Sequence, residues 1–367
     1  METSHWSELK SILAQYDLGD LVGFERNERG TVNTSFAIET QKDGIHNRYF
    51  FRRYKRGVRT EELQCEHSII NHLLSNHFDI VARVYPTREG STFVWRREDA
   101  SDPEGVFYAI FSFLPGEDPY TWIDPVCLPS EIVSSAQVLA RFHQALEGYT
   151  PLGSKVETKI TDLLPVIDGR IVKCLSKAHG TVFDNYLQEN ISLLQDHLYR
   201  TQHRLQRCLR DGCPEVVIHC DYHPGNLKFE NGQVVGLFDL DWSKLDYRCF
   251  DVALALFYFF TCWQSDCDGI LRLDDMDLFV DAYQRTLQGN PGLGPLSNDE
   301  LGCLADMIAA ANLYVVNWTI MDYINKDVDP VEYLMYLQHH IRTIQWLDDP
   351  IHRSLLDDRI QRQQVRD

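Results

Sequence analysis

Residues that could do chemistry are concentrated in one short stretch, "VIHCDYHPGN", which runs from Val217 to Asn226. It combines two histidines, a cysteine and an aspartate, so a metal site, a hydrolase site and a phosphate-handling loop all need consideration. His219 and His223 have the i, i+4 spacing of a zinc-binding helix, but Pro224-Gly225 disfavours a helix and no HExxH glutamate is present. The chain has no G-x-S-x-G elbow, which disfavours an α/β-hydrolase. It also has neither a Walker A sequence nor a GxGxxG motif.

The residues that follow predict a β-hairpin that brings oxygen-bearing side chains together. In "LKFENGQVVGLFDLDW", Asn231-Gly232 is the strongest short-range signal for a two-residue hairpin turn. This turn places Asn226 opposite Leu237, and since side chains alternate along a strand, Asp239 points the same way as Asn226. Asp221 lies just upstream, so the hairpin predicts that two carboxylates and one amide converge.

Carboxylate and amide oxygens are hard ligands that suit Mg²⁺, which binds one or two carboxylates together with phosphate oxygens. Phosphoryl transfer needs such a set, because a metal neutralises the phosphates while one carboxylate is left to orient the attacking hydroxyl. Any one of these residues alone would more often cap a turn. All three in register predict a magnesium and phosphate site.

Composition narrows the function further. The net charge of -19 argues against nucleic-acid binding, which relies on Lys and Arg surfaces. The acidity is compatible with a cationic substrate, although a solvated acidic surface is the commoner explanation. The ten cysteines form no CxxC pair, and we expect them to be reduced core residues, Cys262 and Cys267 included. No signal peptide is recognisable and the longest apolar run is too short to span a bilayer, so we expect a cytoplasmic protein without a membrane partner.

The elements that must position these residues fall into two groups, and we expect a β-rich domain at 1–114 and a helical domain at 115–367. The first group has a short helix at Ser4–Tyr16, strands in "TVNTSFAIET", "NRYFFRRYKRG", "STFVWRRE" and "VFYAIFSFL", and one longer helix in "EELQCEHSIINHLLSN". In the second group, "SEIVSSAQVLARFHQAL" predicts a helix with Ser130 as its N-cap. Further helices are predicted at Phe183–Leu209, Asp251–Trp263, Asp274–Leu287, Glu300–Tyr323 and Pro330–Trp346.

Five segments of the chain resemble those of a known family. "HCDYHPGN" followed by "GLFDLDW" resembles the H-x-D-x-x-x-x-N and (I/F)-D signature of the aminoglycoside phosphotransferase and choline kinase superfamily. "RGTVNTSFAIET", "VLARFHQAL" and "DYRCFDVALALF" are similar to its nucleotide-covering hairpin, its "LA-x-LH" helix and the helix after its metal-binding aspartate. Homoserine-kinase-like members are nearest in loop style. The resemblance implies an α+β, protein-kinase-like, two-lobed fold with a small antiparallel N-lobe sheet, one main helix there, and a larger helical C-lobe.

Carried over by position, the resemblance implies roles in the catalytic loop. Asp221 would be the catalytic base and His219 would support the loop. Asn226 and Asp239 would hold Mg²⁺ on the nucleotide phosphates, and Asp251 would anchor the loop from the start of its helix. Asp241 could contact a second metal or act as an N-cap.

The resemblance also implies a nucleotide site for ATP. Arg52 occupies the strand position where protein kinases have a phosphate-binding lysine, with Glu66 as its helix partner and Glu62 as a second choice. The covering loop would use Gly30, Thr31 and Asn33. Phe111 would lie behind the adenine, and the backbone of Ser112, Phe113 and Leu114 would contact its edge.

The implied reaction transfers the γ-phosphoryl group of ATP to a hydroxyl of a small molecule such as choline, homoserine or an aminosugar. The acceptor pocket could use Tyr258, Tyr314, Trp318 and Asp322, which suit an ammonium group, although aromatics at helical spacing are more often core residues. A catalytically silent nucleotide-binding scaffold is the alternative, favoured only by Arg52. A protein Ser/Thr kinase is disfavoured because no activation segment follows Asp239. The choice of acceptor, the choice between ATP and GTP and the oligomeric state are left open by the sequence.

Overall fold

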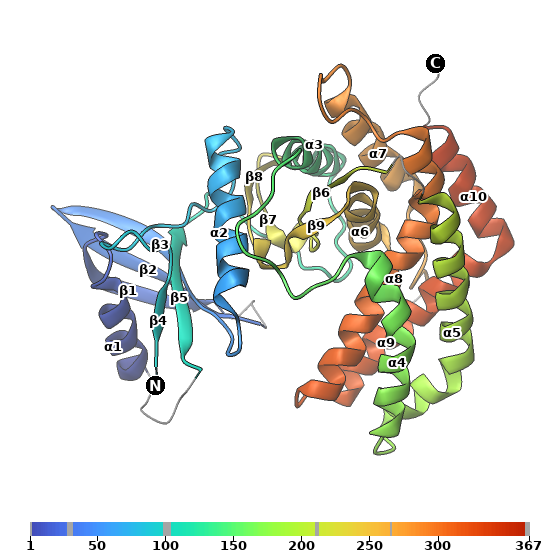
Figure 1. The fold of residues 1–367 in the computed structure, drawn as a ribbon, viewed down its shortest axis with the longest axis horizontal. Coiled ribbons are helices and arrows are strands. Elements are labelled where there is room, and N and C mark those ends of the chain that lie inside the picture. The colour runs from blue at the N-terminus through green and yellow to red at the C-terminus, as the bar shows by residue number, and fades with distance from the viewer. Residues whose placement is uncertain (1, 28–31, 98–103, 210–212, 265, 364–367) are drawn as a thin grey trace. The chain divides into compact units, whose positions relative to one another are not determined.

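The structure is a computed structural model that describes the chain except residues 1, 28–31, 98–103, 210–212, 265 and 364–367 (Figure 1). The described chain divides into two compact units. Unit 1 comprises Met1–Gly116, Pro151–Val156 and Val235–Asp241, and unit 2 comprises Glu117–Thr150, Glu157–Val234 and Trp242–Asp367. Unit 1 therefore includes two short segments that are distant in sequence from its main part.

Unit 1 is built on one antiparallel sheet with the strand order β1-β2-β3-β5-β4. Its strands are β1 (Asp20–Asn27), β2 (Thr34–Lys42), β3 (Ile45–Arg53), β4 (Val94–Arg96) and β5 (Val106–Ser112). Helix α1 (Glu2–Leu13) contributes Leu9 and Ile12 to a buried cluster with Phe36 and Phe51 of the sheet. This small sheet is the predicted β-rich part of the fold, although strand β1 was not predicted because "DLVGFERN" lacks regular alternation.

The alternation of β3 determines where Arg52 points. Phe51 is fully buried among the aromatic residues between the sheet and α1. The next residue, Arg52, pairs in register with Ser35 of β2 and Ala109 of β5, and its side chain bonds to helix α2 (Thr60–Ser75) through Glu66. Successive side chains of a strand lie on opposite faces, so the buried Phe51 directs Arg52 to the face that α2 covers.

Unit 2 is predominantly helical. Its helices are α3 (Pro129–Ala145), α4 (Ile160–Ser176), α5 (Val182–Cys208), α6 (Arg248–Phe260), α7 (Leu273–Leu287), α8 (Asn298–Asn325), α9 (Pro330–Asp348) and α10 (Pro350–Gln361). Strands β6 (Glu215–Ile218) and β9 (Lys244–Tyr247) form a two-stranded antiparallel sheet. Among the described residues, α8 alone has the length and hydropathy of a membrane span, and 89% of that window is buried inside the protein, as in a core helix.

The predicted hairpin is present as strands β7 (Leu227–Glu230) and β8 (Gln233–Leu237), which form a two-stranded sheet. Asn231 and Gly232 have φ values of 52° and 74°. Two consecutive residues with positive φ are the requirement of a type I′ turn, which Asn-Gly meets at low cost. The division between the units falls inside this hairpin.

Three other predictions about local structure were wrong or incomplete. Helix α3 begins at Pro129, and its N-cap is Leu128 rather than Ser130. Proline fixes a helical φ at the first position, and the Glu131 carboxylate accepts the Leu128 N–H at 2.8 Å, so the helix starts earlier. Helices α4 and α10 and strands β6 and β9 were not predicted. In α4, Pro165 and Gly169 interrupt the apolar pattern, yet the helix continues through Pro165 in its second turn.

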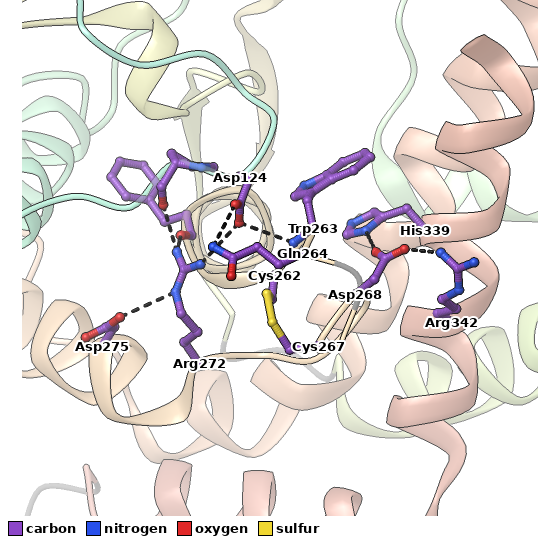
Figure 2. Close-up of a disulfide and its surroundings, with 12 residues drawn as sticks. Asp124, Cys262, Trp263, Gln264, Cys267, Asp268, Arg272, Asp275, His339 and Arg342 are labelled. Carbon is purple, nitrogen blue, oxygen red and sulfur yellow. Dashed lines mark hydrogen bonds and ion pairs between the residues drawn. A yellow bond between two sulfur atoms is a disulfide. The ribbon is translucent and has the colours of Figure 1, made fainter. Parts of the chain in front are cut away.

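The expectation that all cysteines are reduced is wrong for one pair, because Cys262 and Cys267 form a disulfide (Figure 2). The chain turns back between them, with Cys262 N–H donating to Ile270 at 2.9 Å and Gly269 N–H donating to Cys262 at 2.8 Å. The loop presents Trp263, whose ring stacks on His339 with centroids 3.5 Å apart. Spacing alone did not identify this pair because distant segments also hold the loop: Asp124 accepts the Trp263 N–H at 3.2 Å, and Asp268 lies 2.6 Å from His339 (Figure 2).

Candidate active site

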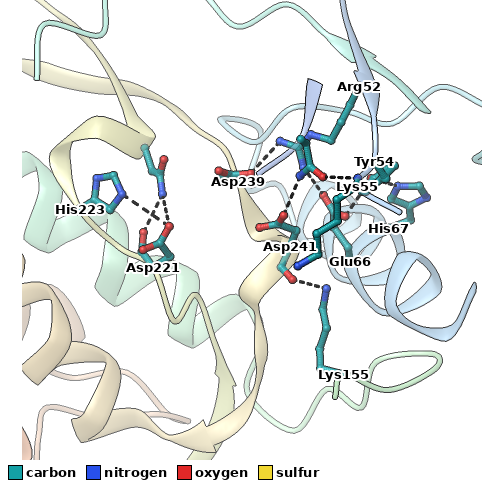
Figure 3. Close-up of polar contacts among 12 residues, drawn as sticks. Arg52, Tyr54, Lys55, Glu66, His67, Lys155, Asp221, His223, Asp239 and Asp241 are labelled. Atoms are coloured by element: carbon teal, nitrogen blue, oxygen red, sulfur yellow. Dashed lines mark hydrogen bonds and ion pairs between the residues drawn. The ribbon is translucent and has the colours of Figure 1, made fainter. Parts of the chain in front are cut away.

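The loop after β6 carries Asp221, whose carboxylate lies beside His223 (Figure 3). The amide nitrogen of Asn226 donates to the Asp221 carbonyl at 2.9 Å and to its carboxylate at 3.0 Å. His223 Nε2 lies 3.6 Å from the same carboxylate, and the hydroxyl of Tyr258 also hydrogen-bonds to it. Asp221 is therefore held in one orientation while its side chain stays partly exposed.

Burial by itself would raise the pKa of Asp221, but His223, His219 and the Asn226 amide favour the charged form and hold the pKa below its ordinary value. The carboxylate is thus ionised at neutral pH. An ionised, oriented carboxylate can accept a hydrogen bond from a hydroxyl group and align it for attack.

Asp251, at the start of α6, anchors this loop through hydrogen bonds to its backbone. Its carboxylate accepts the backbone N–H groups of His219 and Cys220, each at 2.8 Å. This holds Cys220 at a φ of 63°, in the left-handed region that non-glycine residues rarely adopt. The anchoring role that the resemblance implied for Asp251 is thus seen directly in its hydrogen bonds.

A buried histidine completes the anchor. His143 of α3 lies 2.9 Å from Asp251 through Nε2 and 2.7 Å from the Tyr283 hydroxyl through Nδ1, and both Asp251 and His143 are fully buried. Burial lowers the pKa of His143 despite its carboxylate partner, so the ring is neutral, donates its Nε2–H to Asp251 and accepts from Tyr283. His143 and Tyr283 were missed in the sequence because they lie on α3 and α7, far along the chain from Asp251.

In unit 1, Arg52 joins two carboxylates (Figure 3). Its Nη1 lies 3.1 Å from Glu66 and its Nη2 lies 2.9 Å from Asp239, and its side chain is buried. Glu66 occupies the partner position rather than Glu62, whose carboxylate instead accepts the Arg59 N–H at 3.0 Å at the start of α2. Arg52, Glu66 and Asp239 therefore lie together as one ion-pair network.

A chain of hydrogen bonds extends from Glu66 into unit 1. The Tyr54 hydroxyl donates to Glu66 at 3.0 Å and lies 3.1 Å from His67 Nε2, while His67 Nδ1 lies 2.8 Å from the Thr92 hydroxyl. Burial, together with the charges of Arg52 and Lys155, lowers the pKa of His67 to about 3. His67 is therefore neutral throughout the ordinary pH range.

This histidine predicts a pH dependence of stability. Unfolded His67 binds a proton below its ordinary pKa of about 6.5 whereas folded His67 does not, so acidification favours the unfolded state from about pH 6.5 downward. Between pH 7 and pH 5, we expect this residue to cost the folded state about 2 kcal/mol. In urea unfolding, His67→Gln should reduce the pH 7 to pH 5 difference by about that amount. An unchanged pH dependence in this variant would contradict the assignment.

Asp241 lies in the same unit and has an unused oxygen. The Asn33 amide donates to Asp241 Oδ2 at 3.0 Å, and the Lys155 ammonium donates to the Asp241 backbone carbonyl. Asp241 Oδ1 is buried and accepts no hydrogen bond from the described residues. Such an atom suits a hard divalent cation, as does the carboxylate of Asp239. In unit 2, both hydrogen bonds of Asn226 to Asp221 use its amide nitrogen, which leaves its amide oxygen, the atom a cation would bind.

The predicted adenine-binding residues lie on and just after β5. Phe111 is buried, 5.7 Å from the His67 ring between centroids. The N–H of Ser112 already donates to the Arg83 carbonyl at 2.8 Å. The Arg48 guanidinium lies 4.0 Å above the Phe113 ring. Gly30 and Thr31, the other predicted nucleotide contacts, lie outside the described residues.

The four predicted acceptor residues separate into two pairs. Tyr258 and Tyr314 adjoin the loop that carries Asp221, since the Tyr258 ring is 5.3 Å from His223 and the Cys220 thiol donates to the Tyr314 hydroxyl at 3.5 Å. Trp318 and Asp322 lie further along α8. Asp322 forms an ion pair with Lys326 at 2.6 Å and accepts a hydrogen bond from a tyrosine of α9 at 3.3 Å.

Trp318 belongs to an aromatic cluster that the sequence did not predict. Its ring lies 6.3 Å from Trp122, and Trp122 in turn contacts Trp263 at 5.4 Å and Tyr336 at 5.0 Å. These rings come from the segment before α3, the disulfide loop, α8 and α9. Periodicity within a single helix does not reveal a cluster built from four segments.

The sequence is similar to a family of phosphotransferases and to kinases of small molecules. The model of a family described as the phosphotransferase enzyme family matches residues 23–291. A homoserine kinase from Afipia carboxidovorans is 23% identical over 346 residues, which cover 92% of this chain and 93% of that protein.

Two solved structures share the fold. A microcompartment-associated aminopropanol kinase is 16% identical, with a TM-score of 0.68 and coverage of 96% of this chain and 99% of its own. An amicoumacin kinase in complex with AMP-PNP, Ca²⁺ and Ami is 13% identical, with a TM-score of 0.65 and coverage of 95% and 99%. These likenesses confirm the predicted α+β, protein-kinase-like fold, with a small antiparallel sheet in the N-terminal region and a helical C-terminal part.

Proposed function

Because the chain belongs to the phosphotransferase enzyme family, and is thus an enzyme that phosphorylates a hydroxyl of a small molecule, we propose that it uses ATP and Mg²⁺ and that its acceptor is an amino alcohol of the homoserine type. The observation that carries this proposal is the Asp221 loop. Its carboxylate is ionised, oriented by Asn226 and Tyr258, and anchored through Asp251. Under this proposal the enzyme works in the cytoplasm without a nucleic-acid or membrane partner.

Asp221 acts as the catalytic base in this mechanism. Its carboxylate accepts the proton of the acceptor hydroxyl and aligns the oxygen for in-line attack on the γ-phosphorus. The transition state of phosphoryl transfer is loose, so Asp221 contributes to the rate mainly by orienting the acceptor hydroxyl. Early removal of the hydroxyl proton contributes less. The hydrogen bonds from Asn226 and Tyr258 restrict the carboxylate to one orientation before the acceptor arrives.

Asn226 and Asp239 would hold Mg²⁺, and Asp241 would supply a further oxygen through its unpaired Oδ1. When bound, the cation neutralises charge on the transferring phosphates. Arg52 keeps Asp239 in place through a bond at 2.9 Å, while its other nitrogen pairs with Glu66. His219 supports the loop through its backbone N–H, which donates to Asp251. At the nucleotide base, the backbone of Phe113 and Leu114 would contact the adenine.

The amino-alcohol acceptor is supported by the comparisons and by the aromatic residues near the loop. The curated relative is named a homoserine kinase and one structural neighbour an aminopropanol kinase, and both names denote amino alcohols. Tyr258 and Tyr314 adjoin the loop that carries Asp221, where aromatic faces can contact an ammonium group. Asp322 already pairs with Lys326, so under this proposal the rings contribute more than this carboxylate.

An acceptor panel tests this proposal. With Mg-ATP, coupled detection of ADP should show the highest kcat/KM for homoserine, with ethanolamine, 1-amino-2-propanol, choline and an aminoglycoside lower by about tenfold or more. One missing or added polar group changes transition-state binding by that order. A preference for another member of the panel would overturn the homoserine-type acceptor. Mg-ATP binding without ADP release for any acceptor would instead favour a silent nucleotide-binding scaffold.

A further inference from the structure

A short segment of unit 1, Pro151–Val156, here called the strap, follows α3 and precedes α4 in the sequence and lies against helix α2. The strap forms hydrogen bonds with α2 and with Arg59, the residue that precedes α2. Leu152 N–H donates to the Ser68 hydroxyl at 3.0 Å, Ser154 N–H donates to the Glu61 carbonyl at 3.2 Å, and Arg59 donates to the Ser154 carbonyl at 3.4 Å. Three hydrogen bonds within so short a segment hold it in one path.

Gly153 makes this close approach possible. Its φ is 75°, and a Cβ atom at this position would lie 2.2 Å from the Glu61 carbonyl oxygen. No side chain can be accommodated there without moving the backbone. The strap is therefore built to lie against α2, and the residue it delivers, Lys155, has a defined position.

Lys155 reaches the network of Arg52, Glu66 and Asp239 (Figure 3). Its ammonium donates to the backbone carbonyl of Asp241, and its charge acts on Glu66 and on His67. The same region holds three carboxylates, those of Glu66, Asp239 and Asp241, and Arg52 contacts the first two. Besides Arg52 and Lys55, which Figure 3 shows in the same cluster, Lys155 is thus a further cation among these carboxylates.

Arg52 and Lys155 differ in whether they can bind a phosphate without losing an existing ion pair. Arg52 has one nitrogen on Glu66 and another on Asp239, so turning toward a phosphate would break a buried ion pair with one of these carboxylates. Lys155 gives one hydrogen bond to a neutral carbonyl, and an ammonium carries three hydrogens. Lys155 can therefore contact a phosphate oxygen at little cost, through a compact charge whose geometry differs from that of an arginine fork.

We propose that Lys155 supplies the ammonium that binds the nucleotide phosphates, while Arg52 serves mainly to position Glu66 and Asp239. This inference rests on the proposed function, because it assumes a nucleotide whose phosphates lie at Asp239 and Asp241. In protein kinases one strand lysine both contacts the phosphates and pairs with a glutamate. Here, Lys155 of the strap would contact the phosphates, and Arg52 of β3 would pair with Glu66.

The test compares three variants of the full chain by calorimetric binding and by steady-state kinetics. Lys155→Met should weaken Mg-ATP binding about 10- to 100-fold, the loss expected for a charge-assisted hydrogen bond. Adenosine has no phosphate, so its affinity should stay within about twofold of wild type, which also reports that the variant is folded. Lys155→Arg should restore part of the Mg-ATP affinity. Lys173→Met, an exposed lysine of α4, is the matched control and should bind like wild type.

The outcomes separate the inference from the function on which it rests. Equal Mg-ATP affinity in Lys155→Met and wild type, with acceptor-stimulated turnover in both, would overturn the role of Lys155 alone. Equal loss of adenosine and Mg-ATP affinity would overturn it too, because the residue would then support the fold and not the phosphates. A wild-type chain that binds no nucleotide would overturn both proposals.

Discussion

Asp221→Asn is expected to lower kcat about 10²- to 10⁴-fold, the range that general-base catalysis contributes. The asparagine keeps the size of the side chain and can still accept the Asn226 hydrogen bond, but it cannot accept a proton or attract the acceptor hydroxyl as an anion does. Affinity for Mg-ATP should stay within about threefold of wild type, since the carboxylate faces the acceptor in this mechanism. Single-turnover kinetics and equilibrium nucleotide binding measure the two quantities separately.

The matched control for this variant is Asp196→Asn. Asp196 is an exposed residue of α5 in the same unit, so the variant makes the same chemical change away from the loop and should keep wild-type turnover. A kcat for Asp221→Asn within about threefold of wild type would exclude Asp221 as the catalytic base. Loss of nucleotide binding and turnover together would instead indicate that the substitution disturbs the loop.

Asp251→Ala is expected to reduce the free energy of unfolding by at least about 3 kcal/mol, because three buried N–H donors lose their acceptor and each costs about 1–3 kcal/mol. The substitution leaves the N–H groups of His219 and Cys220 and the Nε2–H of His143 without their acceptor in a fully buried site. Turnover should fall as well, because nothing then holds Cys220 at its left-handed φ ahead of Asp221. Urea unfolding at pH 7, followed by circular dichroism, measures the loss of stability.

Two companion variants interpret that result. Asp251→Asn keeps one acceptor oxygen but presents an NH₂ group to the second buried N–H, so an intermediate loss is expected. Asp196→Ala should change the unfolding free energy by no more than about 0.5 kcal/mol, as exposed substitutions usually do. If Asp251→Ala unfolds at the same urea concentration as Asp196→Ala, the anchor does not stabilise the loop as proposed.

Local patterns predicted much of the fold. The alternating strands β2, β3 and β5 and the helices α5 to α9 each carry a periodic signal within one segment, and all are present within a few residues of the predicted bounds. The Asn231-Gly232 turn was predicted because its backbone requirement is met by the two residues themselves. Helix α4 was missed because Pro165 and Gly169 interrupt its pattern, while buried residues such as Leu163, Ile167 and Ile171 stabilise it through packing.

The candidate site shows the same contrast. The sequence by itself determined the loop motif from His219 to Asn226 and placed Asp221 and Asn226 near each other, since close neighbours in a short loop have few alternatives. The resemblance already favoured Glu66 over Glu62 as the partner of Arg52, but only the tertiary structure decided that His143 supports Asp251 and that Lys155 reaches Asp241. Those partners lie on different elements, and their contacts arise from how the elements pack, which no local spacing encodes.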